Sequence, residues 1–523
     1  MDWNFGDLLD ATAAAAPGDR PALIHGDRVI GWRAFDERTN RLARAMRAAG
    51  LEPGARVAIL ARNIPEYIEI VAAAFKARLT YVNLNYRYTT GEIEYVLNDC
   101  AAEALFFHEE FLAVVEPLFG LVASLRLGVR IGPGGGYEDL ASHGDGSPLG
   151  IRRSPDDGYL LYTGGTTGKP KGVMWRSADA RAVQLEAPTV KTPPRDMAEH
   201  VALVSANSAY GRVIPACPLM HGAGSNGAVG ELIGGGTVVL LPEDRFDPEA
   251  LWNEAARTQA TRILIVGDVF ARPMIRTLSR FPGRWDLSHL RVISSAGLMW
   301  SREIKAALIE ALPQLTLVDI LGASEASGFG YAITTASFET PTGLFEPGRN
   351  TVIIDVATDR VLADDEVGEG WLARRPPFAL GYFGDPAKTA ATYRRIGDTT
   401  YAVPGDLAAR QGDGRIKLIG RGNMVINTGG EKVFVEEVEE ALKRAPGVDD
   451  AIIVGVPDET WGRVVVALVC VGEGFDEARV RAALLSELAP YKLPKRILVQ
   501  DELPRHASGK SDYRRAQEIA LMG

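Results

Sequence analysis

The chain has 523 residues, too many for a single hydrophobic core, so we expect two or more domains. Hydrophobic residues make up 46% of the sequence and charged residues 24%, which supports sizeable cores. The formal net charge of −10 argues against a general nucleic-acid binder.

The first part of the chain alternates between helical and strand patterns. Alternation of this kind predicts a largely parallel sheet with helices on both faces. A hairpin is expected over residues 22–32, turning at Gly26-Asp27. The expected helices are 5–15, 34–49, 65–77 and 90–97, and the expected strands are 56–60 and 80–84.

Later segments predict a second α/β layer and then a region of short strands and turns. Residues 132–139 read as turn material. Short apolar runs predict strands at 212–217, 237–241, 262–266, 291–294 and 316–320. Residues 350–375 predict a small β subdomain. Helical and strand patterns alternate again from a helix at 436–445 onward. We therefore place a domain boundary at the polar, glycine-bearing residues 420–423, which gives domains 1–420 and 421–523.

Residues 161–172 form a glycine-rich stretch suited to binding an anion. It contains four glycines, three threonines and two lysines, which supply close backbone approach, hydroxyl donors and positive charge. The common phosphate-loop pattern would need glycine at 163 and Ser or Thr at 170, where this chain has Thr163 and Pro170. The stretch therefore predicts a different phosphate site, with a plain surface loop as the competing interpretation.

Six fragments in order resemble the adenylate-forming superfamily of acyl-CoA synthetases, luciferases and peptide-synthetase adenylation domains. The resemblance spans nearly the whole chain. It implies an α/β fold with a large N-terminal domain of two layered subdomains plus a small β subdomain, and a smaller mobile α+β C-terminal domain. The fragments are 161–172, 322–325, 405–407, 420–421, 429–431 and 508–510.

The resemblance implies that ATP and Mg²⁺ bind at several of these fragments. The glycine-rich loop would hold the β- and γ-phosphates through Thr163, Gly165, Thr166, Thr167, Gly168 and Lys171. Gly164 stands where the family often has serine, so one hydroxyl is missing. In the 322–325 fragment, Gly322, Ala323 and Ser324 would contact nucleotide, and Glu325 would ligate magnesium. Taken alone, Glu325 reads as a helix-start residue.

Two further residues are implied to reach the nucleotide. Asp406 would accept hydrogen bonds from the ribose hydroxyls, with an ordinary Asx turn as the alternative. Arg421 would contact ribose or phosphate. The chain departs from the family at Leu321, where an aromatic residue is common, and at Asn423, where the hinge is usually charged.

Lys510 and His221 are the residues that the resemblance places next to the reacting carboxylate. Lys510 would bridge the carboxylate and the α-phosphate, although an isolated lysine near a terminus is nearly always solvated. His221 would line the acyl site, against a structural histidine as the alternative. The same likeness implies that the acyl pocket is lined by small residues that make room for an acid larger than acetate, together with one methionine: Gly224, Gly227, Ala296, Gly297 and Met299.

The resulting hypothesis is an ATP-dependent acid–CoA ligase with a carboxylic acid, ATP and CoA as its small-molecule partners. Gly429 and Gly430 would let the pantetheine thiol pass close to the backbone, with a plain turn as the competing interpretation. The enzyme would form an acyl-adenylate and then acyl-CoA. The resemblance admits a homodimer.

For the substrate, the likeness is greatest to bacterial ligases of steroid side-chain acids and related fatty acids. It rests on residues 3–5, 162–168, 172–176 and 426–432. The alternatives are a luciferase-like oxygenase and a nucleotide-binding regulator that has lost catalysis, the latter favoured only by Gly164, Leu321 and Asn423. A peptide-synthetase module would need a carrier domain after Lys510.

The sequence predicts a cytoplasmic location. The N-terminus lacks a basic start followed by an apolar run, and no apolar stretch approaches the roughly 18 residues of a membrane span. Cys100, Cys217 and Cys470 are widely spaced, with no metal-ligand pattern and no disulfide framework.

Overall fold

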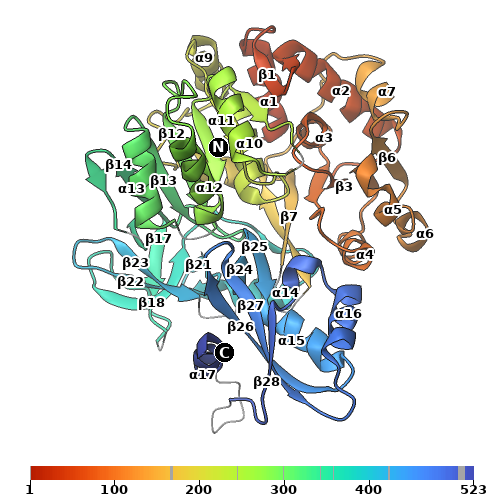
Figure 1. Ribbon diagram of the computed structural model, residues 1–523. Coiled ribbons are helices and arrows are strands. Elements are labelled where there is room, and N and C mark those ends of the chain that lie inside the picture. Colours follow the sequence, from red (N-terminus) through yellow and green to blue (C-terminus); the bar gives the residue numbers. More distant parts are fainter. Residues whose placement is uncertain are drawn as a thin grey trace. The chain divides into compact units, whose positions relative to one another are not determined.

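The computed structural model describes residues 2–164, 169–243, 245–297, 300–341, 343–356, 358–421, 425–504 and 513–522 (Figure 1). The chain forms two compact units. The first comprises Met1–Tyr86, Leu97–Tyr162 and Gly172–Gly420, and the second comprises Arg87–Val96, Thr163–Lys171 and Arg421–Gly523. Among the described residues, no helix has the length and apolar character needed to cross a membrane.

A seven-stranded sheet has the strand order β19-β8-β7-β4-β3-β5-β6. Strands β7, β4, β3, β5 and β6 run parallel, as the alternating pattern predicts. The strands are β3 (Arg56–Leu60), β4 (Thr80–Asn83), β5 (Ala104–His108), β6 (Leu127–Ile131), β7 (Gly158–Gly164), β8 (Pro170–Arg176) and β19 (Gly381–Tyr382). The helices along this part of the chain are α1 (Phe5–Ala15), α2 (Trp32–Ala48), α3 (Pro65–Lys76), α4 (Thr90–Asp99), α5 (Leu112–Val115), α6 (Leu118–Leu121) and α7 (Tyr137–Ser142).

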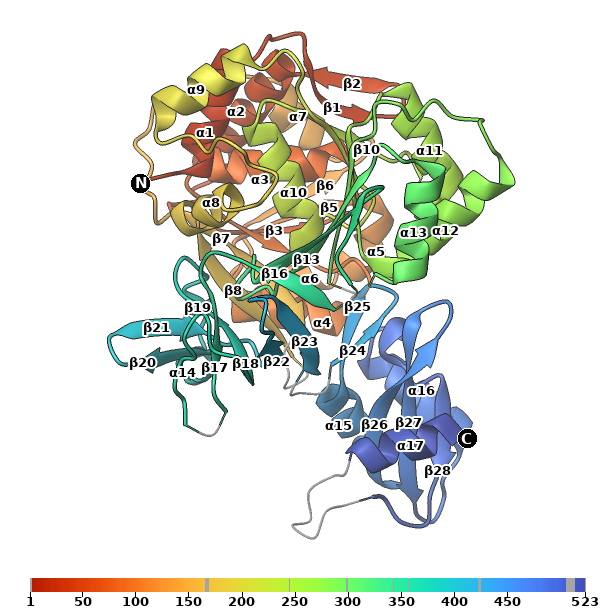
Figure 2. The same cartoon turned by 90° about the vertical axis from the view of Figure 1, so that its left-hand side faces the viewer.

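A sixteen-stranded sheet begins with the predicted hairpin. Its first part runs β2-β1-β10-β9-β11-β12-β13, and all pairs after the hairpin are parallel. These strands are β1 (Pro21–His25), β2 (Arg28–Gly31), β9 (Arg212–Pro215), β10 (Thr237–Leu240), β11 (Arg262–Ile265), β12 (Val292–Ala296) and β13 (Thr316–Leu321). The helices that follow are α8 (Ser177–Leu185), α9 (Met197–Ala206), α10 (Gly222–Ile233), α11 (Pro248–Arg257), α12 (Gly267–Arg280) and α13 (Arg302–Ala311), of which α11, α12 and α13 lie side by side (Figure 2).

The β-rich region predicted near 350–375 continues this same hydrogen-bonded sheet. Strand β14 joins β13 to β16, and β16 pairs with β23, so the ladder passes without a break into the β-rich part. These strands are β14 (Gly330–Thr335), β15 (Phe338–Glu339), β16 (Leu344–Pro347), β17 (Thr351–Ile354), β18 (Gly368–Arg374), β20 (Tyr393–Ile396), β21 (Thr399–Ala402), β22 (Asp406–Arg410) and β23 (Ile416–Arg421), with α14 (Pro386–Thr392) among them.

The C-terminal part of the second unit packs helices on both faces of a three-stranded sheet. Because side chains alternate along a strand, Ile453 of β26 packs in the cluster that contains α15, whereas its neighbour Ile452 packs in the cluster that contains α17. The elements are β24 (Val425–Thr428), β25 (Glu431–Phe434), α15 (Val435–Arg444), β26 (Val448–Asp458), β27 (Gly462–Val471), α16 (Glu477–Glu487), β28 (Arg496–Val499) and α17 (Tyr513–Met522). The sequence-predicted fold class is confirmed.

A buried histidine joins three helices of the first unit. The Thr12 hydroxyl of α1 donates to the Ile233 carbonyl of α10 at 2.9 Å, so it accepts from Nε2 of His200 in α9 at 3.0 Å. His200 is only 3% exposed and packs edge-on against Trp3. Burial, and then the charge of Arg181, lower the pKa of His200 to about 4 from 6.5.

This histidine predicts an acid-sensitive fold. Unfolded His200 takes up a proton near pH 6.5, whereas folded His200 stays neutral down to about pH 4, so stability is lost as the pH falls through that window. We expect the unfolding temperature to drop less between pH 7 and pH 5 in His200→Gln than in the wild type. His143→Gln, at a side chain that is 78% exposed, is the control and should follow the wild type. Equal pH dependence in all three proteins would contradict the assignment.

Candidate active site

The loop of residues 322–325 follows β13 at the carboxyl end of a parallel strand, where ligands of α/β proteins commonly bind. Strand β8 and the segment before β19 hold this loop through its backbone. The indole Nε1 of Trp175 donates to the Ser324 carbonyl at 2.8 Å, and the Ala379 amide donates to the Glu325 carbonyl at 3.2 Å. The structure therefore brings the Glu325 loop against the strand that leaves the glycine-rich stretch.

Two tyrosines orient Glu325. The Tyr382 hydroxyl donates to the Glu325 Oε1 at 2.6 Å, and the Tyr393 hydroxyl donates to the Glu325 carbonyl at 3.3 Å. Burial raises the pKa of Tyr393 well above its ordinary value, and the charge of Glu325 raises it further. The phenol therefore stays protonated and keeps donating.

A buried arginine fixes the chain that follows Glu325. Arg374 is fully buried and donates to the Gly328 carbonyl at 2.9 Å and to the Pro377 carbonyl at 3.1 Å. Its guanidinium also pairs with Glu186. Gly328 has φ +74°, a left-handed angle that glycine adopts without strain. The chain that follows Glu325 is therefore held by hydrogen bonds from Arg374.

His221 is the N-cap residue of α10 and follows the loop that leaves β9. The space beside two of the predicted pocket glycines is filled by protein atoms. A Cβ on Gly224 would lie 2.5 Å from the Pro218 carbonyl oxygen, and one on Gly227 would lie 2.2 Å from Leu264 Cδ1. These glycines let α10 pack closely against its neighbours, so room for an acid does not follow from their small size.

The other predicted residues in the first unit occupy strand ends. Ala296 is the last residue of β12 and pairs with Ile320 of β13, which places it beside the strand that leads to Gly322 and Ala323. Gly297 follows with φ +94°. Asp406 begins β22 directly after Gly405, which has φ +102°. Residues beside strand ends are positioned by the sheet, and binding residues are often found there.

Several predicted site residues belong to the second unit or lie outside the described residues. Thr163 lies near the end of β7, Lys171 near the start of β8, and Arg421 at the end of β23. Gly429 and Gly430 form the two-residue turn between β24 and β25, both with positive φ. Those that lie outside the described part of the chain are Gly165, Thr166, Thr167, Gly168, Met299 and Lys510, together with the hinge residue Asn423.

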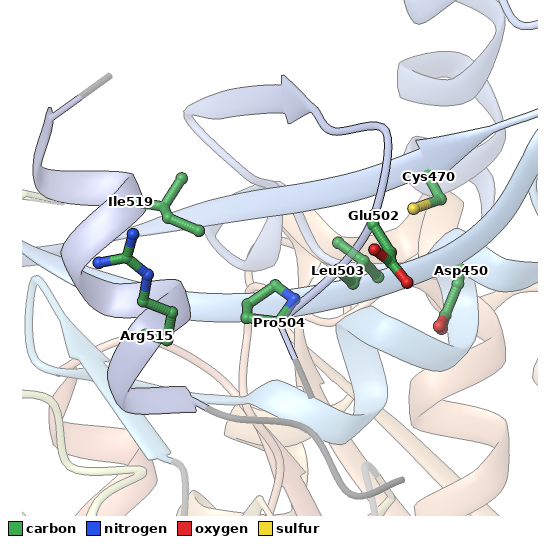
Figure 3. Close-up of a pocket in the computed structure, with 7 residues that line it drawn as sticks. All are labelled: Asp450, Cys470, Glu502, Leu503, Pro504, Arg515 and Ile519. Atoms are coloured by element: carbon green, nitrogen blue, oxygen red, sulfur yellow. The ribbon is translucent and has the colours of Figure 1, made fainter. Parts of the chain in front are cut away.

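A hollow of about 580 Å³ on the second unit does not match the chemistry of an ATP site (Figure 3). The lining carries two carboxylates, those of Asp450 and Glu502, against one guanidinium, that of Arg515, and the excess negative charge disfavours phosphate groups. None of the predicted site residues lines it. Across the described ranges, no group of three or more His, Cys, Asp or Glu side chains is arranged to hold a metal ion.

Sequence reasoning missed the residues that position the site, Tyr382 and Asn83 among them. Asn83 ends the apolar strand β4 and hydrogen-bonds to the backbone of Tyr162 and of Met220. A polar residue at the end of a buried strand was the available signal. Tyr382 follows Gly381 in a two-residue strand, and no periodicity distinguishes it.

Comparison with known proteins gives one consistent result. Residues 9–383 match the family described as AMP-binding enzyme, and residues 437–510 match its C-terminal domain. The chain is 36% identical to a medium-chain acyl-CoA ligase, Mig, of Mycobacterium avium, over 99% of this chain and 98% of the relative. It is also 36% identical to a 3-oxocholest-4-en-26-oate–CoA ligase of Rhodococcus rhodochrous, over 99% and 96%. Among solved structures, the amide bond synthetase McbA of Marinactinospora thermotolerans superposes with a TM-score of 0.81 at 25% identity, covering 98% and 99% of the two chains.

The turn at Gly429 leaves no room for a side chain at that position. Gly429 has φ +57°, and a Cβ there would lie 2.6 Å from the Trp461 ring, so Gly429→Ala should destabilise the second unit by both strain and overlap. The matched control is Gly462→Ala, where φ is +73° and no atom lies within 4 Å.

We expect the free energy of unfolding to fall by about 1 kcal/mol in the control, because of strain alone, and by about 2–4 kcal/mol in Gly429→Ala. Denaturant unfolding followed by tryptophan fluorescence measures both losses. Equal losses in the two variants would show that the Trp461 contact has no energetic weight.

Proposed function

The chain belongs to the AMP-binding enzyme family and is an AMP-forming acid–CoA ligase, and we propose that it activates a medium-chain, long-chain or steroid side-chain carboxylic acid. The carboxylate attacks the α-phosphate of ATP and pyrophosphate leaves. The CoA thiol then attacks the acyl-adenylate, giving acyl-CoA and AMP. The observation that carries the substrate class is the full-length likeness to ligases of medium-chain and steroid acids.

We assign the first step to both domains. Residues 1–420 would bind ATP and the acid, and residues 421–523 would bring Lys510 to the carboxylate. Thr163, Lys171 and the loop between them would hold the leaving pyrophosphate, because hydroxyl, amide and ammonium donors neutralise its developing charge. Asp406 would contact the ribose, Arg421 the ribose or a phosphate, Ser324 a phosphate, and Gly429 and Gly430 the pantetheine arm. We place this chemistry in the cytoplasm, where ATP and CoA are available.

Glu325 fits a magnesium ion that is carried by phosphate groups. Mg²⁺ is usually bound through one or two carboxylates plus phosphate oxygens and water, so a single fixed carboxylate is enough. The hydrogen bond from Tyr382 uses Oε1 and leaves Oε2 for a cation. The ion would neutralise phosphate charge when ATP binds.

A screen of acid-dependent pyrophosphate release tests the proposal. The panel holds medium-chain, long-chain, aromatic and steroid side-chain acids, each with CoA and without it. We expect release with lipid acids and acyl-CoA only when CoA is present. Release limited to aromatic acids would overturn the substrate class, and no release with any acid would favour a regulator.

A second candidate acceptor is an amine. The superposition on an amide bond synthetase favours it, because that protein shares the fold over nearly its whole length. An arm of the same screen replaces CoA with small amines, and product masses separate amide from thioester. Amide in place of thioester would reassign the second step.

Lys510 should act on the first half-reaction alone. Lys510→Ala removes the charge that stabilises the transition state for adenylation, so we expect acid-dependent pyrophosphate release to fall by about 100-fold or more. Conversion of synthetic acyl-adenylate to acyl-CoA should stay within about threefold of the wild type. Lys417→Ala, at an exposed lysine of β23, is the control. Normal pyrophosphate release by Lys510→Ala would remove Lys510 from the mechanism.

Tyr382 should set the magnesium requirement through Glu325. Tyr382→Phe removes the hydroxyl that fixes the carboxylate, so the Mg²⁺ concentration for half-maximal pyrophosphate release should rise about tenfold. Tyr393→Phe is the matched control, because its hydroxyl donates to the Glu325 backbone carbonyl and not to the carboxylate. The idea fails if both variants titrate alike.

A further inference from the structure

The loop between β9 and α10 is buried although it has no regular structure. Ala216, Cys217, Leu219 and Met220 are each no more than 8% exposed. Backbone amide and carbonyl groups in such a loop need partners, because an unpaired buried group costs about 1–3 kcal/mol. The Ala216 and Cys217 amides donate to the Leu264 carbonyl of β11. The Leu219 amide and the Cys217 and Met220 carbonyls instead bond to two asparagines, one just after β3 and one at the end of β4, in neighbouring strands of the seven-stranded sheet.

Asn63 follows β3 and binds the first part of the loop. Its Nδ2 donates to the Pro215 carbonyl at 3.1 Å and to the Cys217 carbonyl at 3.0 Å. Its Oδ1 accepts from the Leu219 amide at 2.8 Å. These three hydrogen bonds of the Asn63 side chain all go to Pro215, the last residue of β9, and to the loop that follows it.

Asn83 ends β4 and joins the loop to a second segment. Its Nδ2 donates to the Met220 carbonyl at 2.7 Å and to the Tyr162 carbonyl at 3.1 Å. Its Oδ1 accepts from the Tyr162 amide at 2.6 Å. The side chain is 4% exposed, and both amide hydrogens are used. One side chain thus binds residue 162 of β7 and residue 220 before α10.

Asparagine suits this position because the site needs two donors and one acceptor. Reversing the amide would turn its oxygen toward two carbonyls, so the network itself assigns the orientation. Aspartate would keep the acceptor and lose both donors. Alanine would leave two carbonyls and one amide without a side-chain partner in the core.

We propose that Asn83 is a positioning residue that couples the phosphate-binding stretch to the acyl site. Tyr162 directly precedes Thr163, and Met220 directly precedes His221, so Asn83 fixes the backbone one residue before each of them. This inference rests on the proposed function, in which Thr163 contacts phosphate and His221 contacts the acid. Adenylation requires those two reactants to meet at about 3–3.5 Å, where a small misplacement is costly.

Hydrogen exchange tests the coupling without any substrate. Asn83→Ala should raise amide exchange in two peptides, residues 159–163 and 216–222. Asn63→Ala is the matched control and should raise exchange only in 216–222. Asn83→Asp, which keeps the bond from the Tyr162 amide, should raise exchange mainly in 216–222 and replaces Asn83→Ala if that variant does not fold. The proposal would be overturned if exchange at 159–163 were unchanged in Asn83→Ala. If Asn83→Asp has to be used instead, unchanged exchange in 216–222 would overturn it.

A double-mutant cycle on pyrophosphate release tests the catalytic consequence. Asn83→Ala, or Asn83→Asp in its place, should lower kcat/KM for the acid by about 10-fold to 100-fold, and by less than about threefold when His221→Ala or Thr163→Ala is already present. The loss of kcat/KM caused by Asn63→Ala should be non-additive with the loss caused by His221→Ala, and additive with the loss caused by Thr163→Ala. Additive effects throughout would show a merely structural role. If the wild type released no pyrophosphate with any acid, the proposed function would fall, and the exchange data would still decide whether Asn83 joins the two segments.

Discussion

The burial of one irregular loop constrains much of the first unit. Ala216, Cys217, Leu219 and Met220 are buried, and their backbone groups bond to Asn63, to Asn83 and to the Leu264 carbonyl. These asparagines stand at the ends of β3 and β4 in the seven-stranded sheet, whereas the loop leaves β9 of the sixteen-stranded sheet. The carboxyl ends of strands from both sheets are therefore tied together by side-chain amides. The segments predicted to bind ATP and the acid begin at that junction.

The Glu325 loop is likewise held by side chains from neighbouring strands. Trp175, Tyr382 and Arg374 come from β8, β19 and β18, and each bonds to the loop or to the chain just after it. A carboxylate that must meet a phosphate-bound cation gains from a fixed orientation, since less freedom is lost on binding. The aromatic and guanidinium groups around Glu325 supply that orientation.

Much of the fold could be predicted because it depends on local pattern. Strand β3 spans the predicted residues 56–60, and the hairpin of β1 and β2 turns at Gly26-Asp27 as expected. The unbroken sixteen-stranded ladder could not be predicted, because it depends on pairing between β16 and β23, which lie far apart in the chain. Residues 132–139 were expected to be turn, because glycines dominate the start of that stretch, but the helix α7 already begins at Tyr137.

Only those residues of the candidate site that belong to sequence motifs could be predicted. Glu325 could be singled out by its place after an apolar strand and by likeness to a family. Asn83 and Tyr382 act through tertiary contacts, which no spacing encodes. Gly224 shows a further limit of sequence patterns, since a Cβ there would meet the Pro218 carbonyl and the small residue therefore has a packing reason of its own.

The most direct test of the central claim is to trap the intermediate. The enzyme is mixed with ATP, Mg²⁺ and a lipid acid without CoA, quenched within one turnover, and assayed by mass spectrometry for acyl-adenylate. We expect one acyl-adenylate for each active enzyme and its conversion to acyl-CoA and AMP when CoA is added. Acyl-CoA that forms with ADP and phosphate, and without acyl-adenylate, would contradict the account.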